Sequence, residues 1–177
     1  MAPKFHPAFL SMTMIIIIRI VNEWQQKSLG YFYGFQGAGA LAGNPKYELS
    51  TAFPQMDSYY GFLSGFAYTV PYSIFGLFSG YLTRSNQRNF ILCLIIVMTS
   101  CFHLNAGVTS SFGMLCAMRI CHGALSSATN PLSYSLVADY YPPEKRGTPN
   151  AILSTGNFIG IALSSISILL IKSFGWR

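Results

Sequence analysis

The chain has 177 residues, of which 51% are hydrophobic and only 9% are charged, with 11 Lys and Arg against 5 Asp and Glu. A soluble domain carries about 25% charged residues, so this composition excludes an ordinary soluble protein, and its high apolar content excludes a disordered one. The basic residues that give the net charge of +6 are scattered, which argues against nucleic-acid binding. We therefore expect an integral membrane protein in contact with the lipid bilayer, with no nucleic-acid partner.

Five apolar segments are candidates for membrane-spanning helices, which need about 20 mostly apolar residues. The first is the weakest, because its uncharged core is short and Arg19 lies near its end, and it could extend through Trp24 toward Tyr33. The stretch 25–57 contains many glycines and two prolines, which is typical of a long loop. The predicted helices span about residues 8–23, 58–83, 90–108, 112–138 and 150–171.

The other connections are short, which makes consecutive helices antiparallel neighbours. The predicted fold class is therefore all-α, a polytopic membrane helix bundle of about five transmembrane helices. An inside N-terminus is favoured, because it places the densely basic short connections on the cytoplasmic side. The inside set is then Lys4, Arg84, Arg88, Lys145 and Arg146, and the outside set is Lys27, Lys46, Lys172 and Arg177.

A polar stripe runs along the fourth predicted helix. Its members are spaced by three or four residues, which places them on one helical face. A charge at the bilayer centre costs about 2.5–3.5 kcal/mol, so a buried arginine needs a specific reason. The favoured interpretation is the wall of a solvent-filled cavity; the alternative is a hydrogen-bonded seam between helices, with the arginine reaching to the interface. The stripe consists of Arg119, His122, Ser126, Asn130 and Ser133.

Small residues spaced by four indicate close helix packing at two places. Gly76 and Gly80 form one such row, and Gly156, Gly160 and Ser164 form the other. Asn157 lies beside the second row, where it could face a cavity.

Arg19 and Glu23 are four residues apart on the first helix and could pair along one face. Two interpretations stay open for them, a charged substrate or coupling site and an interfacial ion pair of little consequence. Motifs of hydrolases, zinc proteases and nucleotide-binding loops are absent from the sequence. We expect no enzymatic activity, no cofactor and no metal.

One long stretch resembles a known family. RICHGALSSATNPLSYSLVADYYPPEKRGTPNAILSTGNFIGIALSS is similar to the fourth and fifth helices of the major facilitator superfamily, especially its spinster-like branch. Arg119 is followed by Gly123 as in that branch, and residues 135–147 match its helix-boundary pattern. GYLTRSNQRN, residues 80–89, falls at the family's loop between helices two and three. The resemblance covers about residues 57–177.

The resemblance implies a transporter in which two six-helix halves enclose a cavity and rock against each other. Residues 1–177 would be a partial N-terminal transmembrane bundle, with the C-terminal half or other membrane subunits as partners. The substrate would be a small organic or lipid-like solute whose anionic head group meets Arg119. The implied substrate path contains Glu23, Arg119, His122, Ser126, Asn130 and Asn157. The implied cytoplasmic gate contains Arg84, Arg88, Asp139, Glu144, Lys145 and Arg146.

The sequence also departs from the family pattern. In the loop between helices two and three, Arg84 and Ser85 replace the family's Asp-Arg pair. In the fourth helix, Ser126 replaces a carboxylate that spinster-like members carry after the glycine. In the first helix, Glu23 is followed by tryptophan where the pattern has arginine. The chain also ends after the fifth predicted helix. These features support the alternative function, a degenerate, non-transporting half that acts as a structural subunit of a larger membrane complex.

Overall fold

A computed structural model describes residues 7–35 and 43–176, and in these ranges every regular element is a helix. This confirms the predicted all-α class. The helices are α1 (Pro7–Gly34), α2 (Leu49–Ala52), α3 (Met56–Gly61), α4 (Ala67–Leu82), α5 (Arg88–Val108), α6 (Phe112–Ser126), α7 (Thr129–Tyr140), α8 (Gly147–Ser164) and α9 (Ser167–Phe174). A π-helical segment, Phe62–Phe66, joins α3 to α4, and a 3₁₀ turn, Pro143–Lys145, precedes α8.

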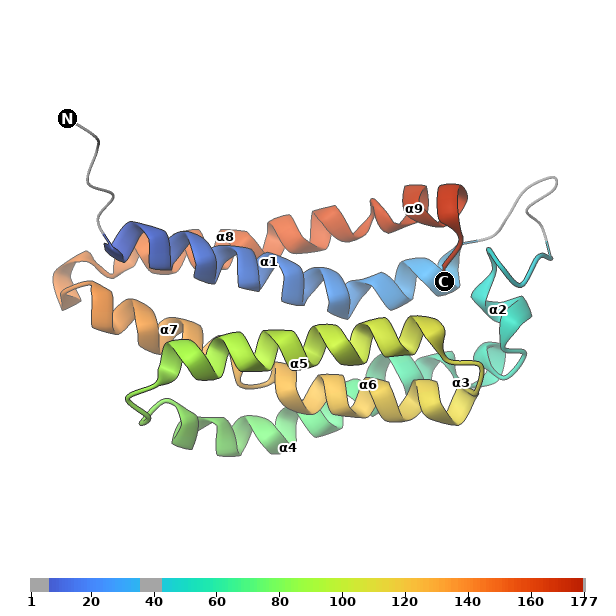
Figure 1. The fold of residues 1–177 in the computed structure, drawn as a ribbon, viewed down its shortest axis with the longest axis horizontal. Coiled ribbons are helices and arrows are strands. Elements are labelled where there is room, and N and C mark those ends of the chain that lie inside the picture. Colours follow the sequence, from blue (N-terminus) through green and yellow to red (C-terminus); the bar gives the residue numbers. More distant parts are fainter. Residues whose placement is uncertain (1–6, 36–42, 177) are drawn as a thin grey trace.

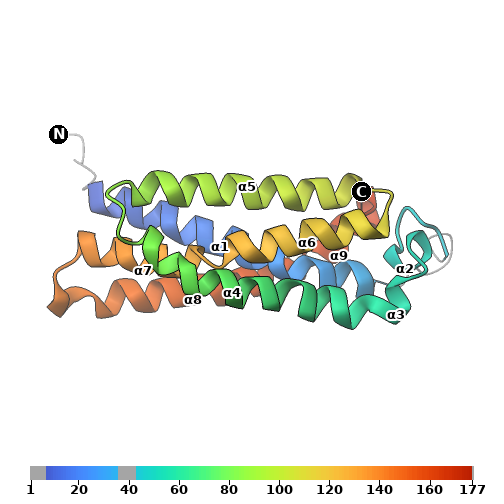
Figure 2. The ribbon, with the colours of Figure 1, turned by 90° about the horizontal axis from the view of Figure 1, so that it is seen from below.

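The long helices lie side by side along one axis (Figures 1 and 2). α1 packs along α8, while α6 packs against both α4 and α5. One end of the bundle carries the α4–α5 and α7–α8 connections and the start of α1 (Figure 1). The opposite end carries α2, the α5–α6 connection and the last described residues.

Within the described ranges, three helical stretches are long and apolar enough to cross a membrane: Met56–Leu82, Arg88–Val108 and Gly147–Phe174. They correspond to the second, third and fifth predicted helices. The first predicted helix lies within α1, whose 28 residues include Arg19, Glu23 and Lys27.

α1 continues to Gly34, so residues 25–34 are helical and the shorter prediction, which ended the helix at Glu23, is wrong there. The extension is stabilised by tertiary packing: Gln25, Ser28 and Leu29 are buried, and the Gln25 amide donates to Ser100 Oγ of α5 at 2.8 Å. α2 also lies inside the predicted loop. Some predicted positions lie outside the described residues. These are residues 36–42 of that loop, Lys4 of the predicted inside set and Arg177 of the predicted outside set.

The fourth predicted helix is divided into α6 and α7 at Ser127 and Ala128. Pro131 explains the division, because it has no N–H to donate to the carbonyl of Ser127 four residues earlier. The Ala128 N–H instead donates to the Leu125 carbonyl, three residues back. The polar stripe therefore crosses a break in the helix.

A polar layer separates two apolar clusters along the bundle. On α1, Ile15 belongs to one cluster and Leu29 to the other. The buried side chains of Arg19, Asn22 and Gln25 lie between them in the sequence. Buried polar groups need hydrogen-bond partners, so this layer, rather than the apolar clusters, is where a specific function is expected.

The same order repeats on the helix pair α6–α7. Leu115 lies in one apolar cluster and Leu132 in the other. Arg119, His122 and Ser126 are buried between them. The polar stripe reaches α1 through Arg119, which donates to the Gln26 carbonyl.

The two glycine rows differ in what they contact. A Cβ on Gly160 would lie 2.7 Å from both the Ile20 carbonyl oxygen and Glu23 Cβ, so α8 approaches α1 closely at this point. No described atom lies within 4 Å of a Cβ built on Gly80, and at Gly76 only Ser127 Cβ does, at 4.0 Å. Within the described residues, the Gly76–Gly80 row therefore makes no helix contact as close as the one at Gly160, although close packing was the prediction for this row.

Candidate functional site

Several buried polar atoms of the central layer have no hydrogen-bond partner among the described residues. On α6 they include Arg119 Nε, both ring nitrogens of His122 and Ser126 Oγ. On α1 they include Nε and Nη1 of Arg19. A buried donor or acceptor without a partner costs about 1–3 kcal/mol. Their concentration in one layer indicates an interior that contacts water or a polar solute.

Arg119 is 8% exposed and is held from two sides. Its Nη2 donates to the Gln26 carbonyl of α1 at 2.7 Å. The guanidinium lies over the ring of Tyr68 on α4, 4.8 Å from the ring centroid. No carboxylate forms an ion pair with Arg119 in the described part of the chain, so its positive charge is free to attract an anion.

Two histidines lie beside Arg119. The rings of His103, on α5, and His122, on α6, are 6.0 Å apart. His103 Nε2 lies 3.4 Å from Ser28 Oγ, and the His122 ring packs 5.6 Å from the Tyr68 ring. Both histidines can donate or accept hydrogen bonds in their neutral forms. They extend the set of polar groups around the arginine.

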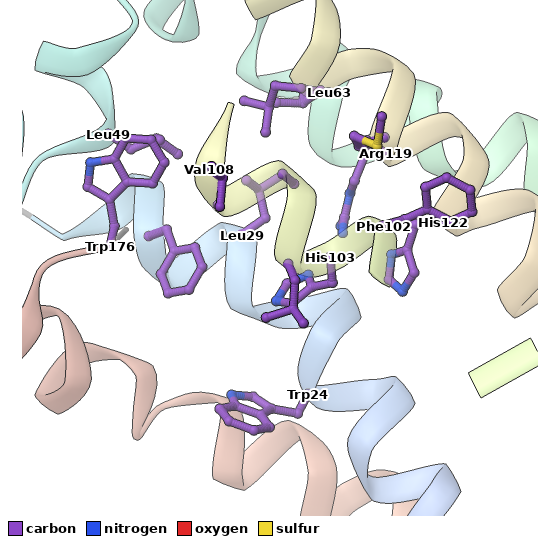
Figure 3. A pocket seen from close by; sticks show the side chains of 16 residues that line it. Trp24, Leu29, Leu49, Leu63, Phe102, His103, Val108, Arg119, His122 and Trp176 are labelled. Atoms are coloured by element: carbon purple, nitrogen blue, oxygen red, sulfur yellow. The ribbon is translucent and has the colours of Figure 1, made fainter. Parts of the chain in front are cut away.

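Arg119, His103 and His122 line a cavity of about 580 Å³, named cavity 1 here (Figure 3). Arg119 and His122 lie on one side of it, and Leu49 with Trp176 on the opposite side (Figure 3). The remaining lining is almost entirely apolar and comes from α1, α5, α6 and the segment before α4. A volume of this size with few polar groups is typical of small-molecule sites.

A second cavity of about 450 Å³, cavity 2, lies among α1, α4 and α8. Its lining is more polar and includes Glu23, Lys27 and Asn157. Arg19 is 1% exposed and donates through Nη2 to Asn157 Oδ1, which lines this cavity. Arg19 therefore bonds to α8, and no ion pair with Glu23 forms within the described residues.

The predicted path residues thus divide between two cavities. Arg119 and His122 line cavity 1, whereas Glu23 and Asn157 line cavity 2. Asn130 donates to the Tyr72 hydroxyl at 2.9 Å, and Tyr72 lines cavity 2.

Two members of the stripe lie deeper in the bundle. Ser126 is 1% exposed between the histidine cluster and the break after α6. Ser133 is fully buried and donates to the Thr129 carbonyl of its own helix at 2.7 Å. Ser133 is therefore satisfied locally, whereas Ser126 Oγ remains available to a further partner.

The predicted gate residues lie at the opposite end from α2. Arg88 forms an ion pair with Asp139 at 2.9 Å and also donates to Ser135 Oγ at 2.6 Å, which ties α5 to α7. Arg146 donates to the carbonyls of Ala138 and Tyr141 at the end of α7, at 2.8 and 2.9 Å.

The other predicted gate charges do not join this cluster. Arg84 lies over the ring of Tyr81 at 5.8 Å from its centroid. Glu144 and Lys145 are exposed in the 3₁₀ turn. No ion pair involves any of these three within the described ranges.

Three residues of the site are missing from the predicted set: Arg19, Tyr68 and His103. Arg19 was predicted to pair with Glu23, either as a charged substrate or coupling site or as an interfacial ion pair, whereas the structure pairs it with Asn157. Tyr68 is 3% exposed and contacts both Arg119 and His122. A tyrosine within an apolar, aromatic-rich segment gives no signal that separates it from a packing residue.

A sequence profile of the Major Facilitator Superfamily matches residues 49–177. Searches of curated proteins and of solved structures gave no match. The profile covers the helices from α2 to α9, including both cavities except for the part lined by α1. Members of this family are transporters embedded in the lipid bilayer. The chain, with its apolar helix bundle and buried polar layer, therefore belongs to the major facilitator superfamily and is an integral membrane protein of the transporter type.

Proposed function

We propose that the chain takes part in the transport of a small organic or lipid-like solute by alternating access, as the N-terminal part of a major-facilitator-type transporter. Cavity 1 carries this proposal, because one cation, Arg119, faces an otherwise mostly apolar chamber. A solute with an apolar body and an anionic head group matches that chamber. Burial of the body contributes about 25 cal/mol per Å², and the head group supplies the missing counter-charge. The resemblance to the spinster-like branch at Arg119 and Gly123 supports the same substrate class.

In this proposal the solute passes from cavity 1 through the polar layer toward cavity 2. Charged groups at adjacent helix ends can exchange partners between two packings, so the Arg88–Asp139 ion pair would hold one of the two states. The cytoplasmic gate would also contain Arg84, Glu144, Lys145 and Arg146.

The chain provides its own optical probe for cavity 1. Trp24 and Trp176 are its only two tryptophans, and both line cavity 1. Energy transfer from tryptophan to parinaric acid, a fluorescent single-chain carboxylate, would report binding there. The matched control ligand is the corresponding polyene alcohol, which has the same chain without the charge.

We expect the carboxylate to bind more tightly than the alcohol in protein reconstituted at a fixed lipid ratio. Arg119→Met should weaken carboxylate binding about 10–100-fold, since a charged hydrogen bond contributes about 1.5–3 kcal/mol, and should leave the alcohol unaffected. Lys27→Met removes a cation that lines cavity 2 and should change neither affinity. Equal affinities of the two ligands, or unchanged carboxylate binding in Arg119→Met, would contradict the proposal. Absence of binding by both ligands would support the structural-subunit alternative.

A further inference from the structure

Tyr68 occupies the position between the two cavities. Its side chain lines cavity 2. Its ring also packs against Arg119 and His122, both of which line cavity 1. Tyr68 is 3% exposed, and so it is buried between cavity 2, which it lines, and two residues that line cavity 1, Arg119 and His122.

The two chambers differ in chemistry. Cavity 1 has a mostly apolar wall with a cationic group on one side. Cavity 2 holds a carboxylate, Glu23, and a cation, Lys27, together with the amide of Asn157. A solute that moves from cavity 1 to cavity 2 past Tyr68 would exchange an apolar for a polar environment.

The backbone on which Tyr68 sits is held firmly. A Cβ on Gly123 would lie 2.5 Å from the Tyr68 carbonyl oxygen and 3.1 Å from its Cα, so the backbones of α4 and α6 touch there. Real Cβ atoms do not approach so closely, so only glycine at position 123 permits this contact. The backbone of Tyr68 cannot shift toward α6, and displacement of its ring requires rotation of the side chain or bending of α4.

α4 is irregular on both sides of Tyr68. The π-helical segment Phe62–Phe66 ends two residues before it, and Pro71 follows three residues after it. Pro71 has no N–H, so the Ala67 carbonyl lacks its usual donor four residues ahead. π-Helical turns and proline positions are common sites of helix bending.

The contacts of the ring are of a kind that a solute can replace. The Tyr68 ring is buried and contacts the Arg119 guanidinium through a cation–π interaction. A cation–π contact contributes about 0.5–2 kcal/mol, whereas a charge-assisted hydrogen bond from Arg119 Nε to an anion contributes about 1.5–3 kcal/mol. An anion in cavity 1 therefore competes effectively for the guanidinium that now rests on the ring.

From these observations we propose that Tyr68 is an inner gate that separates cavity 1 from cavity 2 and opens when an anion draws Arg119 away from its ring. The proposed separation rests on Tyr68 lining cavity 2 while contacting Arg119 and His122 of cavity 1. Its role in transport rests on the proposed function.

Thiol labelling tests the gate without any solute. In a background with the four native cysteines replaced by serine, Met118→Cys places a reporter in cavity 1, and Ile161→Cys places the control reporter in cavity 2. The probe is a methanethiosulfonate with a trimethylammonium group, a membrane-impermeant cation that cannot act as the opening anion, applied to protein in lipid nanodiscs. Each reporter is combined with Tyr68→Ala, Tyr68→Leu, Tyr68→Phe or the native tyrosine.

A gate whose open state is populated at 10% or less should give at least about a tenfold faster reaction at Met118→Cys when Tyr68 is shortened to Ala. Tyr68→Leu should act in the same direction while keeping more packing volume, which covers the case in which the alanine variant fails to fold. Tyr68→Phe keeps the ring and should react at the native rate, and Ile161→Cys should react equally in all backgrounds. Equal rates at Met118→Cys in the native, Ala and Leu backgrounds would overturn the proposal, as would a parallel increase at Ile161→Cys.

The outcome separates the gate from the proposed function. Faster labelling of cavity 1 in the shortened variants, combined with no selective binding of parinaric acid, would support the gate and reject the substrate class. Selective binding with unchanged labelling would support the substrate class and reject the gate.

Discussion

The contact of α8 with α1 at Gly160 gives a stability prediction with a control in the same helix. In Gly160→Ala the new methyl group would lie 2.7 Å from the Ile20 carbonyl oxygen. Carbon–oxygen contacts are usually about 3.3 Å or longer, so the helices must separate by roughly 0.6 Å. The obstructing atoms include backbone, which cannot rotate away. Overpacking of this kind costs about 1–3 kcal/mol.

Gly156→Ala is the matched control, one turn earlier on α8. Its Cβ would meet Ile16 and Arg19 atoms at 3.7 Å or more, an ordinary contact distance. Both substitutions gain the same helix propensity, about 1 kcal/mol, so this contribution cancels in their comparison. The difference of about 1–3 kcal/mol between the two variants should therefore report the α1–α8 contact alone.

Thermal unfolding followed by circular dichroism in detergent measures this difference. A chain of this length shifts by about 2–4 °C per kcal/mol, so Gly160→Ala should melt about 2–12 °C below Gly156→Ala. Equal melting temperatures, or a higher value for Gly160→Ala, would refute the reasoning that backbone proximity at Gly160 sets the α1–α8 spacing.

Three further predictions concern polar contacts between segments that are distant in the sequence. Asn157→Ala leaves the Arg19 guanidinium buried without its hydrogen-bond acceptor and should lower the free energy of unfolding by about 1–3 kcal/mol. The double variant Arg19→Met, Asn157→Ala removes the buried charge as well, and it should recover much of that loss in the same melting assay. Asp139→Asn should change the free energy of unfolding by less than about 1 kcal/mol, because the ion pair with Arg88 is partly exposed. A larger coupling energy between Arg88 and Asp139 in a double-mutant cycle would show that the pair stabilises the fold, and would contradict its proposed role in switching between two states. Trp176→Phe removes a hydrogen bond of 2.8 Å to the Pro45 carbonyl and should cost about 0.5–1.5 kcal/mol, with faster amide hydrogen exchange in residues 46–53; unchanged exchange there would show that this bond does not hold the segment.

The spacing of polar residues along one helix was predictable from the sequence alone. Arg119, His122 and Ser126 recur at helical intervals and do share an inward face. Their partners were not predictable, because these lie far away in the chain. Arg119 meets Gln26 and Tyr68, which belong to α1 and α4. Only the packing of three helices brings these groups together.

Helix ends were predicted less well than helix positions, for local and for tertiary reasons. Pro131 is a local signal for the division between α6 and α7 that hydropathy alone overlooks. The extension of α1 toward Tyr33 was one of two sequence-based alternatives, because the stretch is aromatic but its glycines are also typical of a loop. Contacts such as Gln25 with Ser100 decide that it is a helix.

By itself the sequence determined that this protein lies in a membrane as a bundle of helices, because so few charged residues cannot cover a soluble surface. It also determined which helix face is polar, because that depends only on spacing along one element. Tertiary structure decided that the interior contains two cavities, and that Tyr68 lines one and contacts residues of the other. The physical reason is that a cavity is formed by side chains from several helices, whose relative placement depends on close contacts such as that of Gly123 with Tyr68.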